Sequence, residues 1–245
     1  MKNLEWIKTK LIAHRGLHTG NSITPENSMK AFRLAIDKNY GIECDVNVLK
    51  DGTVVVFHDK DLKRMCGDNR CLQDLTIEDI KQVHLLDSNE RIPTLQEFLD
   101  LVDSRVPLLI ELKPNGSYKV LCEAFMKVMD RYQGEWAMHS FHPGSVNWFR
   151  INRPEVIRGQ ISEYFLQDNK MNKLLRFCMK HLLFNIVTHP DFVNYGIHNL
   201  PNKYVDRAQR RGIVIIAYAA HNQEQFDMCK QHYSNSVFEF FEPKH

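Results

Sequence analysis

Apolar and polar residues alternate along the chain in blocks that predict β-strands and α-helices in turn. The predicted strands are short and apolar, and they lie at 11–13, 41–59 (a hairpin), 107–114, 136–141, 156–161, 184–188, 213–220 and 237–241. Segments with apolar residues at helical spacing separate them, at about 29–36, 94–102, 118–132, 143–152, 166–183, 204–211 and 223–231. Eight strands separated by helices in about 250 residues is typical of a (β/α)8 barrel.

We therefore expect one α/β domain over residues 1–245, a TIM (β/α)8 barrel with a hairpin and a short insertion after strand 2. An open doubly wound sheet is the alternative, but no Gly-x-Gly-x-x-Gly pattern follows the first strand to support it. The insertion corresponds to residues 60–91, where the apolar pattern weakens. A connection of this length is a candidate lid or substrate pocket.

The hairpin at 41–59 carries the first candidate site residues. Glu43 and Asp45 share one face of its first strand, because side chains on a strand repeat every two residues. Asp51-Gly52 is a favoured two-residue turn, and a turn centred there would pair Asp45 with His58. A lone Glu-x-Asp pair is more often a solvated face than a metal site, so the hypothesis depends on residues elsewhere.

Further candidates lie at the ends of the two neighbouring predicted strands. His14 and Arg15 follow the first strand, and Glu111 and Lys113 end the third. Active sites of parallel barrels lie at the carboxyl ends of the strands, so these residues should converge with the hairpin. Glu111 and Lys113 alone could be a surface ion pair, but the apolar run that precedes them favours a buried site.

The overall composition narrows the class of partner. With 43% hydrophobic residues the chain can bury a large core, and 32 basic against 30 acidic side chains give a net charge of +2. This balance provides no global field for nucleic acid or for an anionic membrane. No apolar run approaches the length needed to span a bilayer. Scattered cysteines and the absence of a secretory signal predict a cytoplasmic protein with reduced thiols. The oligomeric state is not predicted.

The candidate residues suit chemistry on a phosphodiester. Three carboxylates without a cysteine among them favour a hard divalent cation, Mg²⁺ or Ca²⁺. Two histidines supply an acid and a base near neutral pH, and arginine and lysine attract an anionic group. Such a set can neutralise phosphoryl oxygens, activate a nucleophile and protonate a leaving alcohol.

Several ordered motifs carry a family resemblance over nearly the whole chain. They are Ala-His-Arg-Gly at 13–16, Pro-Glu-Asn-Ser at 25–28, Glu-x-Asp-Val at 43–46, Asp-Gly-x-Val-Val-x-x-His-Asp at 51–59, Leu-x-Arg at 62–64, Ile-Pro-Thr-Leu at 92–95 and Glu-x-Lys at 111–113. With them the sequence resembles the glycerophosphodiester phosphodiesterase family, in particular its short single-domain bacterial members. It departs from the family pattern at Tyr218-Ala219, where a Trp-Thr pair is common, and at Leu49, where Thr is common.

The resemblance implies a role for each candidate residue. It implies a TIM barrel with His14 and His58 as the catalytic acid/base pair and with Arg15 and Lys113 near the substrate phosphate. It also implies one divalent cation, Mg²⁺ or Ca²⁺, held by Glu43, Asp45 and Glu111. The implied substrate is a small glycerophosphodiester, hydrolysed to glycerol 3-phosphate and an alcohol. The departures leave these residues intact but put the shape of the alcohol or glycerol pocket in question.

Two alternatives use the same sequence differently. A lysophospholipase D-like or phosphoinositide-type phosphodiesterase would keep the chemistry and act on lipid, with acyl chains held by the 60–91 insertion or by the apolar region at 171–186. A non-enzymatic ligand-binding barrel would be expected to have a broken metal or histidine set. Which histidine acts as acid is left open, as is the choice between water and a substrate hydroxyl as nucleophile.

Overall fold

The computed structural model describes residues 2–21, 23–167 and 171–244. The chain forms two compact units, one of residues 12–136 and one that combines residues 1–11 with residues 137–245. Each unit contains parallel strands connected by helices. The prediction of a single domain over 1–245 remains a prediction.

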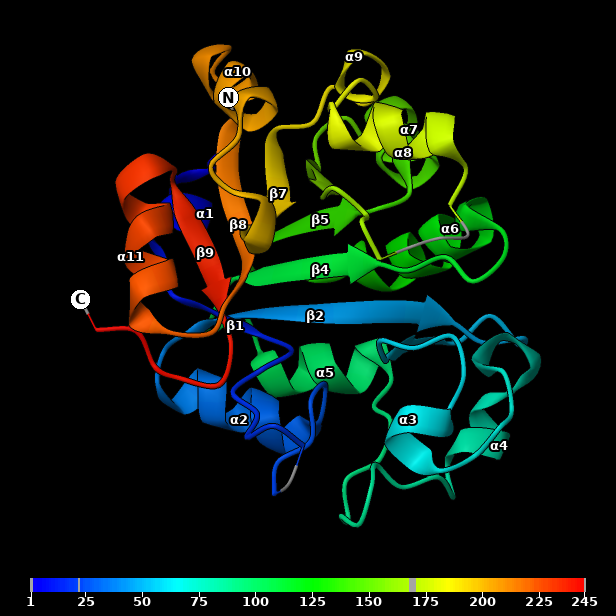
Figure 1. The fold of residues 1–245 in the computed structure, drawn as a ribbon. Coiled ribbons are helices and arrows are strands. Elements are labelled where there is room, and N and C mark those ends of the chain that lie inside the picture. Colours follow the sequence, from blue (N-terminus) through cyan, green and yellow to red (C-terminus); the bar gives the residue numbers. More distant parts are fainter. Residues whose placement is uncertain (1, 22, 168–170, 245) are drawn as a thin grey trace. The chain divides into compact units, whose positions relative to one another are not determined.

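Unit 12–136 is built on three parallel strands in the order β1-β2-β4, with an antiparallel strand, β3, paired to the end of β2. The strands are β1 (Ile12–His14), β2 (Gly41–Val48), β3 (Val54–Val56) and β4 (Leu108–Leu112). The α-helices are α2 (Met29–Asp37), α3 (Lys63–Cys66), α4 (Ile77–Ile80), α5 (Leu95–Val102) and α6 (Tyr118–Met129), with a 3-10 turn at Leu72–Asp74. Helices α2 and α5 lie side by side along β2 (Figure 1).

Two predicted helix starts are set by side-chain caps. Ser28 accepts a hydrogen bond from the Ala31 backbone N–H at the start of α2. Thr94 accepts one from the Glu97 N–H, and the Glu97 carboxylate accepts one from the Thr94 N–H. This reciprocal capping box satisfies two backbone donors that the first helical turn leaves without partners. Both helices therefore begin where the sequence predicts.

The hairpin register differs by one residue from the prediction. Val46 pairs with Val56 and Val48 with Val54, so the residue opposite Asp45 is Phe57, whose N–H donates to the Asp45 carbonyl at 2.9 Å. The loop has three residues instead of two, because Leu49 pairs with Thr53 and Gly52 adopts a φ of +87°. Three-residue hairpin loops commonly place such a left-handed residue last. The predicted direct pairing of Asp45 with His58 is therefore wrong.

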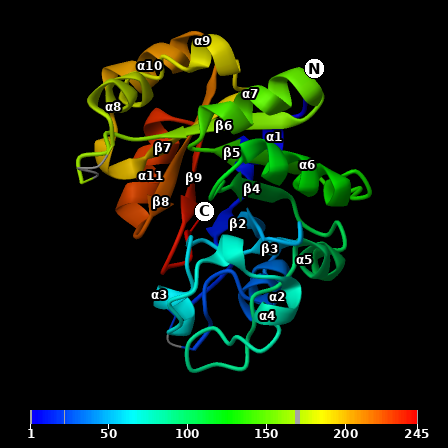
Figure 2. The ribbon, with the colours of Figure 1, turned by 90° about the vertical axis from the view of Figure 1, so that its right-hand side faces the viewer.

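The segment after β3 has a small hydrophobic core of its own. Its buried side chains come from the second half of the hairpin and from the turns of the insertion; they are Leu49, Val55, Phe57, Leu62, Met65, Leu72, Leu75, Ile80, Val83, Leu85 and Ile92. The insertion is thus a packed structure rather than a structureless connection. Figure 2 shows α3 and α4 within it.

The second unit continues the alternation of strands and helices. Its five parallel strands follow the order β5-β6-β7-β8-β9. They are β5 (Trp136–Ser140), β6 (Ile157–Ser162), β7 (Phe192–Gly196), β8 (Val214–Ala220) and β9 (Asn235–Phe238). The helices are α1 (Glu5–Thr9), α7 (Pro143–Asn152), α8 (Lys173–Lys180), α9 (Asn185–Thr188), α10 (Lys203–Arg210) and α11 (Gln223–His232), with a 3-10 turn at Ile197–Asn199.

One predicted strand is wrong. Residues 184–188, taken as a strand for their β-branched run, include the short helix α9, and the strand lies at 192–196 instead. The true strand contains Asn194, Tyr195 and Gly196, so its apolar signal is weaker. Part of the predicted helix at 166–183 lies outside the described residues.

The count of strands agrees with the prediction despite this shift. Among the described residues, eight parallel strands alternate with helices, and β3 is an excursion after the second of them. This is the (β/α)8 order with a hairpin and an insertion after strand 2. None of the helices in the described ranges is long and apolar enough to cross a bilayer.

We expect Gly52→Ala to destabilise the protein by about 1–2 kcal/mol, because an L-residue with a Cβ is strained in the left-handed conformation of the hairpin loop. No atom lies within 4 Å of the Cβ position, so the loss would come from the backbone and not from a clash. Urea unfolding measures it. Lys50→Ala, an exposed change in the same loop, should leave the free energy of unfolding within about 0.5 kcal/mol of the original.

Candidate active site

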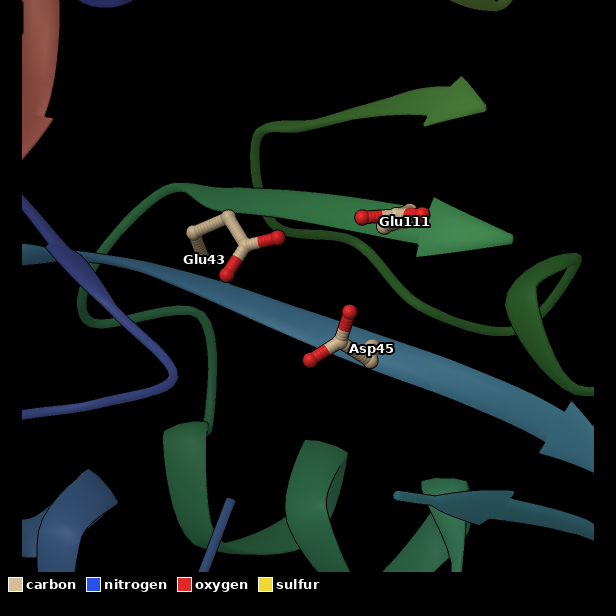
Figure 3. Close-up of side chains that lie close together, drawn as sticks. All are labelled: Glu43, Asp45 and Glu111. Carbon is tan, nitrogen blue, oxygen red and sulfur yellow. The ribbon is translucent and has the colours of Figure 1, made fainter. Parts of the chain in front are cut away.

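Three buried carboxylates lie together on two adjacent parallel strands. Glu43 and Asp45 come from β2 and Glu111 from β4, and the register places Asp45 directly beside Glu111. One oxygen from each lies within 4.8 Å of the others. All three side chains point to the same side of the sheet, as Figure 3 shows. The sequence prediction that these acids converge is confirmed.

The end of β1 brings His14 and Arg15 to the same acids. His14 is paired in register with Glu43, and its Nε2 lies 3.8 Å from Glu43 Oε2. The Arg15 backbone N–H donates to the same oxygen at 3.2 Å. Arg15 has a φ of +57°, a conformation that is rare for a residue with a side chain and that aims its N–H at Glu43.

Two cations flank the buried Asp45. Arg15 Nε lies 3.3 Å from Asp45 Oδ2, and Lys113 Nζ lies 3.7 Å from Asp45 Oδ1. Lys113 Nζ also donates to Glu111 Oε1 at 3.0 Å. The Lys113–Glu111 pair is therefore part of the carboxylate cluster and not an exposed surface pair.

His58 lies just beyond β3 and is oriented by its neighbour in the chain. Its Nδ1 is 2.6 Å from Asp59 Oδ1. Hydrogen bonds from His58 and Arg64 lower the pKa of Asp59 although partial burial opposes this, so the carboxylate is ionised and can only accept. The hydrogen of the His58 ring therefore lies on Nδ1, which leaves Nε2 for proton transfer. When its ring is protonated, His58 is also close enough to lower the pKa of Asp45.

Glu26 connects the Arg15 side of the cluster with the His58 side. Its carboxylate accepts from Arg15 Nη1 at 2.8 Å and from Arg64 Nη1 and Nη2 at 2.9 and 2.7 Å. Arg64 Nε in turn donates to Asp59 Oδ2 at 2.8 Å. Charges of opposite sign thus alternate from Asp45 through Arg15, Glu26 and Arg64 to Asp59. This network of charged side chains links Arg15, next to His14, with Asp59, the partner of His58.

The pKa values of Glu43 and Asp45 are shifted in opposite directions by their surroundings. Burial, reinforced by the charge of Asp45, raises the pKa of Glu43 to about 8. Burial also opposes ionisation of Asp45, but the positive charges of His58, Arg15, Lys113 and His14 together lower the pKa of Asp45. Burial thus dominates at Glu43, and the neighbouring positive groups dominate at Asp45.

Six of the seven predicted site residues therefore meet within one unit, and His58 of the same unit is linked to them through Asp59, Arg64 and Glu26. His139 and His189, two further histidines near predicted strand ends, lie in the other unit. His139 Nδ1 is 3.3 Å from Asn194 Nδ2, and His189 ends α9 rather than a strand.

The chain matches the model of the glycerophosphoryl diester phosphodiesterase family over residues 14–238. This range contains every residue of the cluster and nearly all of the chain.

The chain belongs to this family.

Curated relatives and solved structures agree with the family match. The Bacillus subtilis protein YhdW is 27% identical over 226 residues, 87% of each chain. A glycerophosphodiester phosphodiesterase of Bacillus altitudinis is 34% identical over 160 residues, 60% of this chain and 64% of the relative.

Solved structures show the fold. A phosphodiesterase from Oleispira antarctica, in complex with the product sn-glycerol-3-phosphate, has a TM-score of 0.80 at 20% identity and covers 95% of this chain and 93% of its own. A glycerophosphodiester phosphodiesterase from Thermotoga maritima has a TM-score of 0.71 at 22% identity, with 94% of each chain covered. The fold is the predicted TIM (β/α)8 barrel, and the family identifies the protein as a phosphoric diester hydrolase of the glycerophosphodiester phosphodiesterase class.

Sequence reasoning missed the residues that hold the site in place. Asn27 donates from Nδ2 to Asp45 Oδ2 at 2.9 Å, while its Oδ1 accepts from the Asp45 N–H at 3.4 Å. Glu26, Asp59 and Arg64 had no predicted role either. All four lie in the family motifs at 25–28, 51–59 and 62–64, so the motifs contained the signal, but their spacing does not reveal which partners they contact.

We expect Glu26→Gln to destabilise the protein by on the order of 2–3 kcal/mol at pH 7, because it leaves Arg15 and Arg64 without their shared charge partner. Hydrogen bonds and charge from the two arginines outweigh burial and lower the pKa of Glu26 from 4.5 to about 2. A folded-state pKa below the unfolded value stabilises the fold above about pH 4.5, and this contribution is lost as the pH falls toward 2.

The difference in unfolding free energy between the original protein and Glu26→Gln should therefore shrink from pH 7 to pH 3. Chemical unfolding at both pH values measures it. Glu123→Gln, on the exposed face of α6, serves as the control and should change the free energy of unfolding little at either pH. A Glu26→Gln penalty that is the same at both pH values would show that charge pairing is not its cause.

Proposed function

We propose that the protein hydrolyses small glycerophosphodiesters to glycerol 3-phosphate and a free alcohol, with the seven clustered residues as its catalytic site. The observation that carries the proposal is the meeting of three buried carboxylates with His14, Arg15 and Lys113 at the ends of neighbouring strands, in a chain of this family. A chain of hydrogen bonds through Asp59, Arg64 and Glu26 links His58 to Arg15. The Oleispira antarctica relative in fold, solved with sn-glycerol-3-phosphate as its product, supports the same product here.

His14 and His58 are the proposed proton-transfer pair. Asp59 fixes the His58 ring so that Nε2 faces away from the Asp59 contact and is available to give or take a proton. One histidine deprotonates the nucleophile, either water or the glycerol hydroxyl of the substrate, and the other protonates the leaving alcohol oxygen. Arg15 and Lys113 bind the phosphate oxygens and stabilise the negative charge that builds up on them.

The acid cluster fits a divalent cation. Asp45 Oδ1 is buried and accepts no hydrogen bond from the described residues, and one oxygen of each of the three acids lies within 4.8 Å of the others. Glu43, Asp45 and Glu111 would hold the ion through oxygen donors, which suits Mg²⁺ or Ca²⁺. The ion would supply positive charge to the phosphoryl oxygens.

The proposal is tested by incubating the purified protein with glycerophosphocholine, glycerophosphoethanolamine and glycerophosphoglycerol in the presence of Mg²⁺ or Ca²⁺. Release of glycerol 3-phosphate, measured with a coupled dehydrogenase, is the expected result. Lysophospholipid in the same panel tests the lipid-acting alternative. Turnover of lysophospholipid alone, or of no diester at all, would contradict the proposal.

We expect His58→Ala and His14→Ala each to fold and to lose turnover by about 10²–10⁴-fold, the usual contribution of one general acid or base. Asp59→Asn keeps a polar partner for His58 but no longer fixes the Nδ1 hydrogen, so a smaller loss in kcat is expected, about tenfold or more. Circular dichroism and steady-state kinetics check both points. Full turnover by a folded His58→Ala variant would exclude the proposed role.

We expect a chelator to abolish turnover and Mg²⁺ or Ca²⁺ to restore it. Because the ion would bind the folded protein and not the unfolded chain, saturating metal should also raise the melting temperature. Asp45→Asn should lose most of this thermal shift, while Asp100→Asn, an exposed change on α5, should retain it. An unchanged melting temperature in the original protein would contradict the metal assignment independently of any activity assay.

A further inference from the structure

Large apolar side chains are exposed on two consecutive helices of the unit that contains residues 137–245. On α8, Leu174 is 70% exposed and Phe177 51%, and on α9, Ile186 is 73% exposed and Val187 52%. Singly exposed apolar residues are ordinary, but four of this size within fourteen residues form a patch. We name it, together with Arg207 and Arg211 of the neighbouring α10 segment, the α8–α10 surface; Figure 2 shows the three helices.

Ring contacts and a cavity join the apolar helices to α10. The Phe177 and His181 ring centroids are 3.9 Å apart, and those of His181 and Tyr204 are 4.1 Å apart. Beside them lies a cavity of about 190 Å³ whose lining includes Leu183, Ile186, Arg207 and Arg211. The cavity thus combines apolar walls with two guanidinium groups, a combination that matches an amphiphile with an anionic head.

The charge around this surface is strongly one-sided. Residues 171–190 and 203–211 contain seven lysines and arginines and a single acid, Asp206. Asp206 Oδ1 accepts a hydrogen bond from Tyr233 OH. Arg207 and Arg211 are four residues apart, so they share a face, and within the described part of the chain neither guanidinium has an ion-pair partner. The near-neutral balance of the whole chain conceals this local excess of positive charge.

We propose that the α8–α10 surface binds the anionic phospholipid surface of a membrane. Exposed apolar side chains would enter the boundary between headgroups and acyl chains, while Arg207 and Arg211 would bind lipid phosphates. A second copy of the chain fits less well, because a two-fold symmetric contact would place the same basic residues against each other. The inference goes beyond hydrolysis, since binding to a membrane requires no turnover.

The experiment is co-flotation of the full-length protein with vesicles of phosphatidylcholine and with vesicles in which about a third of the lipid is phosphatidylglycerol. The protein should bind the anionic vesicles and not the neutral ones, and high salt should weaken binding because it screens the charge attraction. Ile186→Ser should lower the vesicle partition coefficient about tenfold, and the Arg207→Gln/Arg211→Gln double variant about fivefold for each charge removed.

Matched control variants are made at exposed positions of α6, in the unit of residues 12–136. Val120→Ser has the same 51% exposure as Phe177, and Lys119→Gln/Lys127→Gln removes two positive charges. These controls should bind vesicles as the original protein does. All variants should release glycerol 3-phosphate from a water-soluble diester at the original rate, so a failure of the catalytic proposal would be seen separately.

Three results would overturn the inference. The first is absence of binding to anionic vesicles by the original protein. The second is an equal loss of binding in the α6 controls, which would show that binding is not specific to the α8–α10 surface. The third is a dimer in sedimentation equilibrium that Ile186→Ser dissociates, which would identify a second copy as the occupant of the surface.

Discussion

Asp45 is a buried negative charge, and the site is arranged around it so that positive groups and hydrogen-bond donors stabilise its ionised form. A carboxylate without exposed surface would be neutral unless positive groups and hydrogen bonds stabilised its ionised form. Arg15 and Lys113 lie on two sides of it, and Asn27 donates to it. These groups come from the loop after β1, from the end of β4 and from the start of α2. The fold must bring three chain segments together to keep Asp45 charged.

A series of oppositely charged pairs connects Arg15 with His58, one of the proposed proton-transfer groups. Arg15 is held by Glu26, Glu26 also binds Arg64, and Arg64 binds the Asp59 that orients His58. Breaking a buried charge pair is costly because the remaining partner stays uncompensated. Each member is therefore fixed by its neighbours on both sides, and no catalytic candidate has to be rigid by itself. All of these residues lie in the unit of residues 12–136.

Much of the secondary structure could be predicted from the sequence, because it is determined by neighbouring residues. The caps Ser28 and Thr94 set helix starts, and the buried run 108–112 set β4, because these signals act over a few residues. The hairpin register was missed because it depends on the conformation of Gly52, which the dipeptide Asp51-Gly52 does not determine. The run Ile186-Val187-Thr188 was misread because β-branched residues favour strands only where the sheet buries them. Here two of them are exposed on α9.

The roles of Glu26, Asn27, Asp59 and Arg64 could not be predicted from spacing, since their partners lie up to 38 residues away. The catalytic candidates themselves were recognisable, because the carboxyl ends of neighbouring parallel strands meet by rule. The spacing of residues in the sequence does not show which charged side chains pair with one another in the folded site. That pairing follows from three-dimensional proximity alone.

The separate hydrophobic core of the insertion has a dynamic consequence. Residues that pack chiefly against one another can open as a cooperative group while the remaining strands stay folded. Arg64 lies beside Met65 of that core, and it is the residue that joins Asp59 to Glu26. Amide hydrogen exchange in the insertion would thus report the fraction of molecules in which the orientation of His58 is released, and heating would inactivate the enzyme below the temperature at which its sheet melts.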